Sequence, residues 1–457
     1  MLASSMVFSI IQKSQLEGAK RLDAEYYQHE YFIDFTKGDW RPIGDFLEQC
    51  QYGLSYAMNT TQVGYPIFKM DNIEDAFLFA NNLKYVQINR GEFDDFRLKK
   101  DDILFNRVNA EEFVGRTGIF KLNLESVFAS YLVRLRVKIE SEILSDYLNI
   151  FLNSSFGIRQ IQKIKRRAVN QANVNAEELK QIRFKVLPLN TQKEIEKLSN
   201  QSWQSFENSK YLCSQTEDLF LETLELKNFE SENNLFSIVN LSEAKSADRI
   251  DAEYFNSPCN KMLAQILKGK TAKLGDLVDM TKGVEPGADA YQDGGKLFIR
   301  VSSISKDGLI GKTQKYVSEE LYKEFKSEYQ PQVGEILLTK DASPGMACVV
   351  REPVEGIISS GVMRLKLKDK INPEYLTLVL NSIIGQLQAE RDAGGSIIAH
   401  WKPEQIKNLI VPILPILTQN KIADLLLQSY QSRKKAAELL EEAKLKVEEM
   451  IEKGGEK

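Results

Sequence analysis

Two kinds of hydrophobic spacing alternate along the chain, and each predicts a different element. Short runs rich in apolar and β-branched residues, several of them bounded by glycine, are typical of a curled, mostly antiparallel sheet. These runs occupy residues 65–70, 102–105, 118–122 and 127–137, and again residues 296–301, 335–339, 347–351 and 361–367. A strand-like piece opens each set, at 8–11 and 236–239, and helical spacing predicts one helix after each set, at 145–162 and 373–391. Each set therefore indicates an α+β domain.

Two long amphipathic helices are predicted after the strand sets. Residues 191 to about 227, and 418 to about 452, contain neither proline nor glycine and carry apolar residues mostly at helical spacing. At 1.5 Å per residue each helix would extend about 50 Å, far more than a small domain needs. We favour an antiparallel coiled coil of the two helices, which would relate the domains by an approximate two-fold axis. The alternative is that each helix folds back on its own domain.

The chain contains one internal repeat, which covers almost its whole length. The segment Arg21-Leu22-Asp23-Ala24-Glu25-Tyr26 returns as Arg249-Ile250-Asp251-Ala252-Glu253-Tyr254, and 187–192 returns as 414–419. A repeat this long indicates duplicated domains, because solenoid repeats run at roughly 20 to 50 residues. The predicted boundaries are 1–189 for the first domain, 190–230 for its helix, 231–416 for the second domain and 417–457 for its helix. The centres of the halves differ in sequence, so the domains should present different surfaces.

Composition places the chain among soluble globular proteins. It has 457 residues, of which 43% are hydrophobic and 27% charged, and no run of about 18 apolar residues occurs. Its start lacks the charged and cleavable parts of a secretory signal, so we expect a cytoplasmic protein without a membrane segment. The four cysteines are scattered, which favours reduced thiols. With two histidines and no CxxC spacing, we expect no metal site.

The motifs that catalysis would require are missing. The segment from Gly308 to Thr313 has two residues between its glycines, where a phosphate-binding loop has four, and it is interpreted as a turn. No Gly-x-Gly-x-x-Gly follows a strand, and no Asn-Pro-Pro-Tyr tetrad of an adenine methyltransferase occurs. With two histidines and no nucleophile elbow, a hydrolase triad has no support either.

The net charge is −4, but the charged residues are unevenly distributed along the chain. Acidic residues gather at 438–452 and basic residues at 159–167, and local fields decide where a polyanion docks. Residues 159–173 combine cations with Asn and Gln, which can contact phosphates and adenine edges respectively. A solvated helix end would also explain these cations. In the second half, residues 392–402 take the same place, and Trp401 is interpreted as a buried anchor rather than a stacking platform.

Cations recur at equivalent positions after two strands. Lys69 corresponds to Arg300, and Arg107 corresponds to Lys340. Such cations could contact a partner common to both domains, such as a phosphate backbone, or form structural ion pairs. The candidate DNA-contacting residues are Lys69, Arg107, Asn109, Lys163, Lys165, Arg166, Arg167, Asn170, Gln171, Asn173, Lys282, Arg300, Ser302, Lys340, Ser396, His400 and Lys402.

With these motifs in view, nearly the whole chain resembles the specificity subunits of type I restriction-modification systems. The resemblance is carried by the two Arg-(Leu/Ile)-Asp-Ala-Glu-Tyr openings, by Gly334–Lys340, by the run from Lys282 to Ile304, and by the 414–419 segment followed by Ile422-Ala423. Each motif is moderately specific, and their order, occurring twice with long helices between, is highly specific. The first half departs from the commoner pattern, because Val169–Asn173 replaces the Gly395-Ser396 turn of the second half.

The resemblance implies a non-catalytic reader of double-stranded DNA. Each domain would read one half of a bipartite target, and the paired helices would set the gap at roughly one duplex turn, about 34 Å. Two modification subunits, carrying S-adenosylmethionine, and restriction subunits would complete the complex, and this chain would bind no cofactor itself. Two alternatives remain: a scaffold whose duplicated domains bind proteins only, and a DNA-modifying enzyme in its own right.

Overall fold

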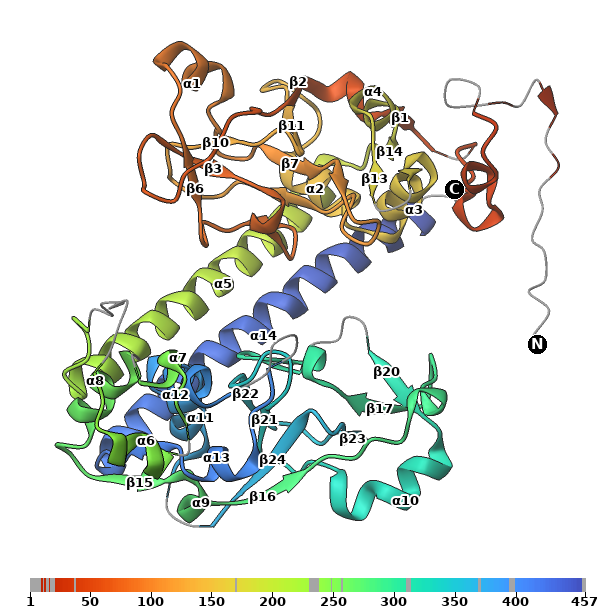
Figure 1. Ribbon diagram of the computed structural model, residues 1–457. Helices are drawn as coiled ribbons and strands as arrows, with labels where there is room; N and C mark the ends of the chain where they lie inside the picture. The colour runs from red at the N-terminus through yellow and green to blue at the C-terminus, as the bar shows by residue number, and fades with distance from the viewer. Residues whose placement is uncertain are drawn as a thin grey trace. The chain divides into compact units, whose positions relative to one another are not determined.

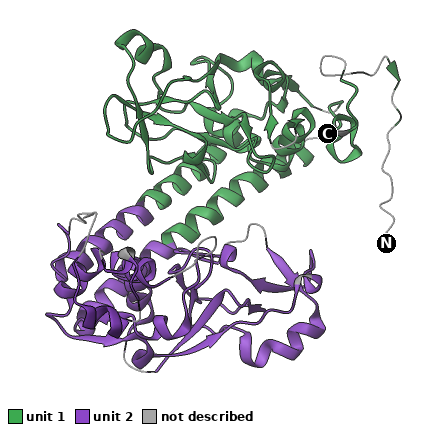
Figure 2. Cartoon of the chain, in the orientation of Figure 1, with its two compact units in different colours: residues 1–207, 432–457 green, residues 208–431 purple. Residues whose placement is uncertain are grey.

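The structure is a computed structural model that divides into two compact units (Figures 1 and 2). Unit 1 comprises Met1–Glu207 and Ser432–Lys457, and unit 2 comprises Asn208–Gln431. The structure describes residues 10, 12–13, 16, 21–36, 38–168, 171–229, 238–247, 249–255, 258–309, 314–368, 371–393 and 399–453. Most of the strand expected at 8–11 and part of the one expected at 236–239 lie outside these residues, and the described Ile10, Ile238 and Val239 are not in a strand.

Unit 1 is built on an open six-stranded sheet of order β2-β11-β7-β9-β5-β4. Its strands are β2 (Leu47–Tyr52), β4 (Ile73–Glu74), β5 (Phe77–Leu78), β7 (Ile103–Asn106), β9 (Thr117–Ile119) and β11 (Leu132–Val137). All pairs are antiparallel except β5 with β9. Strand β7 is buried along its whole length, as its continuous apolar run predicts.

Three smaller sheets complete the β structure of unit 1. Strand β1 pairs with β14, β10 and β6 flank β3, and β13 lies between β12 and β8. Their bounds are β1 (Trp40–Pro42), β3 (Tyr65–Phe68), β6 (Lys84–Val86), β8 (Val108–Asn109), β10 (Val127–Phe128), β12 (Arg166–Arg167), β13 (Ala172–Asn173) and β14 (Arg183–Lys185). The helices are α1 (Arg90–Phe96), α2 (Ser145–Leu152), α3 (Ser155–Ile164) and α4 (Ala176–Lys180), with short 3-10 turns η2 (Ala24–Tyr27), η3 (His29–Tyr31), η4 (Ile43–Phe46) and η5 (Met70–Asn72).

Unit 2 repeats much of this plan, and within its described residues a single Asp341–His400 bridge stands in place of the β12-β13-β8 sheet. Its main sheet has the order β16-β24-β21-β22, β17 lies between β20 and β23, and β15 pairs with β25. The bounds are β15 (Thr271–Lys273), β16 (Val278–Lys282), β17 (Lys296–Ile299), β18 (Ile304–Ser305), β19 (Gly308–Leu309), β20 (Lys315–Val317), β21 (Ile336–Thr339), β22 (Ala347–Val349), β23 (Gly356–Ile358), β24 (Val362–Leu367) and β25 (Ile410–Pro412). One difference stands out: the β18–β19 hairpin forms a separate two-stranded sheet, whereas its counterpart β4–β5 joins the main sheet through β9.

The helices of unit 2 follow the same order. They are α6 (Leu241–Ala247), α7 (Ala252–Phe255), α8 (Pro258–Ile266), α9 (Leu274–Leu277), α10 (Glu319–Tyr329), α11 (Pro373–Asn381), α12 (Ile383–Asp392) and α13 (Pro403–Lys407), with 3-10 turns η6 (Ala288–Ala290) and η7 (Val301–Ser303). The two α+β domains expected from the repeat are therefore confirmed.

The single helix expected in each domain is wrong, because each is broken into two. The break follows Leu152 in unit 1 and Asn381 in unit 2, where Ser154 and Ser382 cap the second helix through their hydroxyls. A glycine in the first turn of each second helix, Gly157 or Gly385, allows the chain to turn sharply. A Cβ at Gly157 would lie 2.3 Å from Phe151 O, and one at Gly385 would lie 2.1 Å from Leu380 O.

The two long helices are α5 (Leu189–Thr223) and α14 (Ile416–Lys453), and segments of both lie side by side within each unit (Figure 1). In unit 1, Ser202 Oγ donates to Ala436 O at 2.7 Å, and Lys446 forms an ion pair with Glu194. Because the residue numbers rise along one helix and fall along the other, the pair is antiparallel. In unit 2, Ser209 Oγ and Ser429 Oγ lie 3.0 Å apart. The expected pairing of the long helices is confirmed.

Each long helix is tied to a domain by a glutamine of the repeated Leu-Pro-x-x-Thr-Gln segment. The buried Gln192 accepts from Leu144 N and donates to Leu187 O, and the buried Gln419 accepts from Asn372 N and donates to Leu414 O. Hydrogen bonds to a neighbouring domain segment thus fix where each long helix starts. In unit 1, Glu448 of α14 also accepts from Ser155 N at 2.6 Å.

Helix α5 ends four residues before the limit expected from sequence, at Thr223. Glu225 takes a left-handed conformation with φ of 56°, Leu226 N donates to Leu221 O and Glu225 N donates to Glu222 O. These are the two hydrogen bonds of a Schellman motif. The motif has glutamate at the position where glycine is usual, so no glycine in the sequence marks this end.

Candidate nucleic-acid interface

In unit 1 a small sheet brings together candidate residues that are far apart in sequence. Strand β13 pairs with β12 and with β8, so Asn173 lies opposite Arg166 and Val108, and Ala172 lies opposite Arg167 and Asn109. Val174 N donates to Arg107 O at 2.9 Å and fixes the same edge. Cations and amides of the 159–173 segment thus share one surface with the loop that follows β7. Asn170 lies outside the described residues, and Gln171 is exposed.

The three consecutive cations of this segment have different environments. Arg166 is exposed and its Nη2 lies 2.9 Å from Glu178 Oε1, while Arg167 is partly exposed and its Nε lies 2.5 Å from Glu111 Oε1. Lys165 is 1% exposed, and its Nζ donates to Glu111 O at 2.8 Å. Burial lowers the pKa of Lys165. Two guanidinium groups are therefore accessible to a partner, and the ammonium of Lys165 is not.

The remaining candidate cations of unit 1 have internal contacts. The Arg107 guanidinium lies 4.8 Å from the ring centroid of Tyr52 and donates to Ser130 O at 3.3 Å. Lys69 forms an ion pair of 3.1 Å with Asp71, and Lys163 lies 4.7 Å from the centroid of the Tyr26 ring. These contacts hold the side chains at the edge of the surface, and they partly neutralise the positive charge that the side chains present to a partner.

The equivalent place in unit 2 is organised by a carboxylate. Asp341 Oδ2 lies 2.6 Å from Lys340 Nζ, and its Oδ1 lies 2.8 Å from His400 Nδ1. Burial opposes the charged form, but the hydrogen bonds from Lys340 and His400 prevail and lower the pKa of Asp341. The backbone pairing matches unit 1, because Asp341 bridges His400 and Trp401 N donates to Lys340 O. Trp401 is 1% exposed, so its expected role as a buried anchor is confirmed.

A hollow of about 640 Å³ lies beside this carboxylate in unit 2. Its lining includes Arg300, Ser302, Asp341, Ser343, Ser360 and Glu285. Arg300 and Ser302, which follow β17, therefore share a surface with the loop after β21. Lys282 and Lys402 are exposed, and Ser396 lies outside the described residues.

The repeated Arg-x-Asp motif positions both surfaces, a role that sequence reasoning missed. Arg21 donates to Ile164 O at 2.8 Å at the end of α3, and Arg249 donates to Arg391 O and Asp392 O at the end of α12. Each guanidinium is held by the carboxylate two residues on, Asp23 or Asp251. It also stacks on an aromatic ring of the motif, Tyr26 or Tyr254. The motif thus fixes the ends of α3 and α12, after which the segments that differ between the two halves begin.

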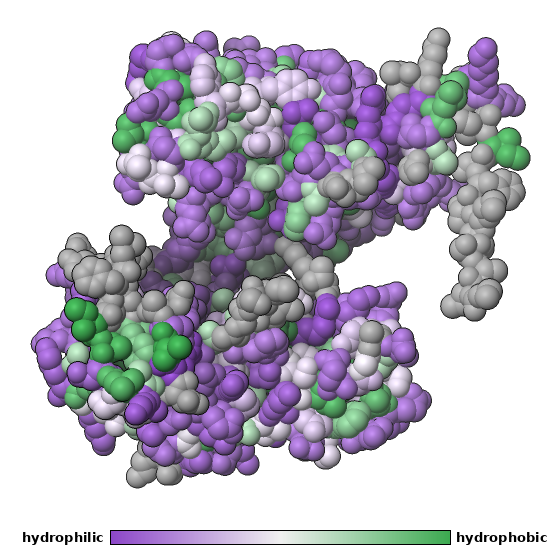
Figure 3. Space-filling model, viewed as in Figure 1, coloured by the Kyte–Doolittle hydropathy of each residue, from purple (hydrophilic) through white to green (hydrophobic). Residues whose placement is uncertain are grey.

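The visible surface of both units is mainly hydrophilic, with limited apolar patches (Figure 3). Among the described residues, no three His, Cys, Asp or Glu side chains are grouped as a metal site would require. None of the helices in the described ranges is both long enough and apolar enough to cross a membrane. What the two surfaces offer is hydrogen-bonding amides, hydroxyls and carboxylates beside cations, a set suited to base edges and phosphates.

A sequence model of the family described as "Type I restriction modification DNA specificity domain" matches residues 39–210 and 268–444. The chain belongs to this family. The match covers one domain of each unit together with segments of the long helices, and so confirms the resemblance inferred from the repeat.

Two curated relatives are similar over part of their length. The type I restriction enzyme MjaX specificity subunit of Methanocaldococcus jannaschii is 32% identical over 182 residues, which is 38% of this chain and 43% of the relative. The type I restriction enzyme EcoKI specificity subunit of Escherichia coli is 25% identical over 151 residues, which is 33% of this chain and 32% of the relative. The chain thus matches less than half the length of these relatives.

A solved structure is similar over most of the chain. It is the S subunit of a type I restriction-modification system from M. genitalium, 13% identical, covering 93% of this chain and 98% of that one with a TM-score of 0.45.

Proposed function

We propose that this chain is the DNA-specificity subunit of a type I restriction-modification complex and catalyses no reaction itself. Each unit reads one half of a bipartite duplex target. The observation that carries the proposal is that the main sheets of both units share one strand order, β2-β11-β7-β9 and β16-β24-β21-β22, yet the units place different side chains at the same point of the fold. Unit 1 places Arg166, Arg167 and Asn173 there, and unit 2 places Asp341 and His400. A shared fold that presents different side chains in each unit fits a target with two different half-sites.

The contacts divide into those that position and those that read. In unit 1, Arg166 and Arg167 contact phosphates, and Asn109, Gln171 and Asn173 face base edges, where a bidentate amide pairs with adenine. In unit 2, Arg300 and Lys402 neutralise phosphates, while the buried Lys340 holds the carboxylate of Asp341 in place. Ser302, His400 and the carboxylate of Asp341 face bases, and a carboxylate accepts from the cytosine amino group.

Helices α5 and α14 set the unread gap and receive the partner subunits. Exposed apolar side chains on them support this role: Tyr211 is 61%, Leu417 81% and Leu445 57% exposed. Modification subunits docked here supply S-adenosylmethionine and the methyl transfer, and restriction subunits complete a nuclease. A protein that works on cellular DNA in this way is located in the cytoplasm.

Fluorescence anisotropy of labelled duplexes with the full chain and a modification subunit tests the proposal. We expect binding that weakens steeply with salt and that differs between duplex sequences. Absent or salt-independent binding would favour the protein-binding scaffold. Methylation of DNA by the purified chain alone would favour the catalytic alternative.

A further inference from the structure

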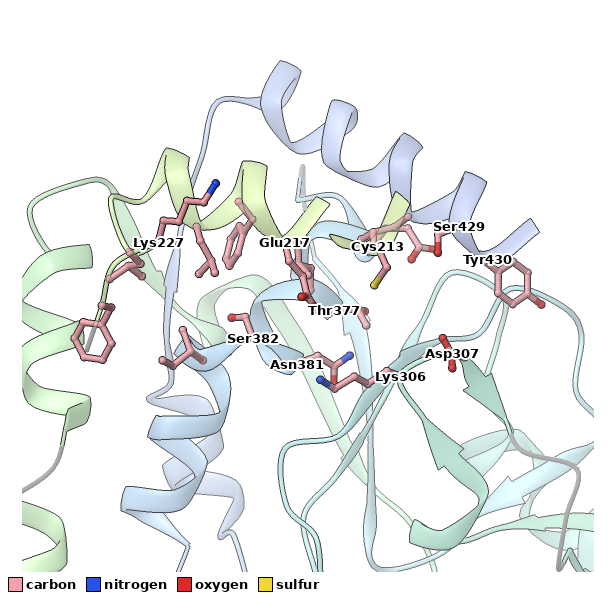
Figure 4. A pocket seen from close by; sticks show the side chains of 18 of the residues that line it. Cys213, Glu217, Lys227, Lys306, Asp307, Thr377, Asn381, Ser382, Ser429 and Tyr430 are labelled. Carbon is pink, nitrogen blue, oxygen red and sulfur yellow. The ribbon is translucent and has the colours of Figure 1, made fainter. Parts of the chain in front are cut away.

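Unit 2 contains a cavity of about 360 Å³ whose lining includes none of the residues assigned to DNA reading. Figure 4 shows side chains from three helices around it: Cys213 and Glu217 from α5, Thr377 and Asn381 from α11, and Ser429 and Tyr430 from α14. Apolar walls come from Phe220, Leu221, Leu226, Phe229, Leu378 and Leu426. A partly enclosed apolar space of this size with a few polar groups is typical of small-molecule sites.

The equivalent place in unit 1 is filled by aromatic rings of the chain itself. The Phe77 centroid lies 5.3 Å from that of Trp203, and the Phe79 ring stacks on Trp203 at 5.5 Å. Phe206 packs against both phenylalanines. By hairpin register Gly308 stands in unit 2 where Phe77 stands in unit 1, since Phe77 pairs with Glu74 and Gly308 pairs with Ser305. Within the described part of unit 2, Gly308 therefore leaves open the place that the Phe77 ring fills in unit 1.

A second difference leaves polar atoms facing this space. In unit 1, Asn149 Nδ2 donates to Ala76 O at 2.9 Å and holds the β4–β5 turn. In unit 2 the shorter Thr377 takes the place of Asn149. Thr377 follows Tyr375 by two residues, as Asn149 follows the equivalent Tyr147. Thr377 is 5% exposed, lines the cavity, and its Oγ1 has no hydrogen-bond partner among the described residues. An unsatisfied buried hydroxyl is costly unless something else pairs with it.

Arg351 adds a second donor at the same cavity. Its Nε and Nη2 are used by Glu374, at 2.8 and 2.6 Å, and its guanidinium lies 4.3 Å from the centroid of the Tyr430 ring. The remaining Nη1 is buried and has no hydrogen-bond partner within the described part of the chain. Two donors without acceptors, Thr377 Oγ1 and Arg351 Nη1, therefore line one apolar space.

We propose that this cavity binds a neutral, planar ring compound that carries a hydrogen-bond acceptor. The ring takes the space that Phe77 fills in unit 1, and the acceptor pairs with Thr377 Oγ1 beside Arg351 Nη1. Neutrality follows from the lining, which holds equal numbers of cations (Lys227, Lys306 and Arg351) and carboxylates (Glu217, Asp307 and Glu374). A cavity of roughly 150 Å³ already admits benzene, so the space here holds one ring with substituents.

Such a ligand would bridge α5, α11 and α14 within unit 2, and this role lies outside DNA reading. Benzamide is a suitable probe, because it joins a neutral ring to a carbonyl acceptor. With the full chain and no DNA, we expect saturation-transfer NMR signals from benzamide at millimolar concentration. Benzamide should also slow alkylation of the cavity-lining Cys213 by iodoacetamide, measured by mass spectrometry. Benzoate, which has the same ring but a charge, should bind at least about tenfold more weakly, because Glu374 already neutralises Arg351 and the carboxylate would add an uncompensated buried charge.

Variants separate the site from non-specific binding. Thr377→Val removes the hydroxyl and keeps the shape, so benzamide affinity should fall about tenfold. The matched control is Thr216→Val in α5, whose hydroxyl donates to Leu212 O at 2.7 Å and which does not line the cavity. This control should leave the affinity unchanged. Leu426→Trp fills the space and should abolish both the NMR signal and the protection of Cys213.

Absence of benzamide binding to the wild-type chain would overturn the proposal, as would equal binding by a folded Leu426→Trp chain. Circular dichroism establishes that this variant is folded. Should it not fold, Thr377→Val decides the question, since unchanged affinity in that variant contradicts the assigned contact. None of these measurements includes DNA, so their failure leaves the proposed reading function untouched.

Discussion

Replacing Arg166 and Arg167 together with alanine should flatten the salt dependence of DNA binding. Both guanidinium groups are accessible in the structure, with side chains 55% and 27% exposed. Each phosphate neutralised contributes about 0.9 to the slope of log K against log salt, so losing two contacts should lower the slope by about 2. Anisotropy titrations with a modification subunit at several salt concentrations, roughly 50 to 200 mM, measure this slope.

Lys165 provides the matched control from the same segment. Because its ammonium is buried against Glu111 O, Lys165→Met should leave the slope unchanged. Replacing Glu111 and Glu178 with glutamine should have the opposite effect to the double alanine change and strengthen binding, because it releases both arginines from their ion pairs. An unchanged slope in the double alanine variant would remove Arg166 and Arg167 from the interface. An equal fall with Lys165→Met would show that the slope reports general destabilisation.

Three further predictions concern the stability of the fold and the length of the long helices. Phe77→Ala should lower the free energy of unfolding of unit 1 by about 3 to 5 kcal/mol, because the fully buried ring packs on Trp203 and Phe206; urea denaturation measures this loss. The hydrogen bond from Arg21 lowers the pKa of Asp23 from its ordinary 3.8, so the ion pair stabilises the fold above that pH and the stabilisation is lost as pH falls through the lowered value. Asp23→Asn should therefore reduce Tm at neutral pH and make Tm less sensitive to pH below about 4. Lengthening α5 and α14 by one turn each should widen the preferred gap between half-sites by about two base pairs, as scored by duplexes of varied gap length.

Each of these has a contradicting result. A near-neutral Phe77→Ala change would mean that the aromatic cluster is loosely packed. Equal pH profiles for the wild-type chain and Asp23→Asn would show that Asp23 does not stabilise the fold as a charged group. An unaltered gap after helix lengthening would show that α5 and α14 do not set the spacing.

Much of the architecture could be predicted from the sequence because it is encoded locally or by repetition. The long apolar stripes of α5 and α14 and the doubled motifs predicted the helices and the two domains. The break between α2 and α3 could not be predicted, because apolar residues recur at helical spacing on both sides of Asn153 and Ser154. The cap at Ser154 and the close approach at Gly157 become evident only in three dimensions. The end of α5 was placed too late because Glu225, and not a glycine, takes the left-handed position.

The sequence predicts which segments of the chain contain the candidate site, but not which side chains in them are accessible. In the sequence, Lys165, Arg166 and Arg167 form one basic cluster, since adjacent cations cannot be told apart without their neighbours in space. Burial separates them, and it depends on Glu111, which lies far away along the chain and accepts from Lys165 through its backbone carbonyl. The carboxylate of Asp341 was likewise overlooked as a site residue, because its pairing with His400 requires β21 and the 399–401 segment to meet.

Sequencing the duplexes that the full chain selects from a random pool, together with a modification subunit, tests the central claim most directly. We expect two short specified segments separated by a gap of fixed length and unspecified sequence. Substitutions at Arg166 and Arg167 should alter binding through one segment, and substitutions at Asp341 and His400 through the other. Recovery of a single continuous motif, or of no preferred sequence, would contradict it.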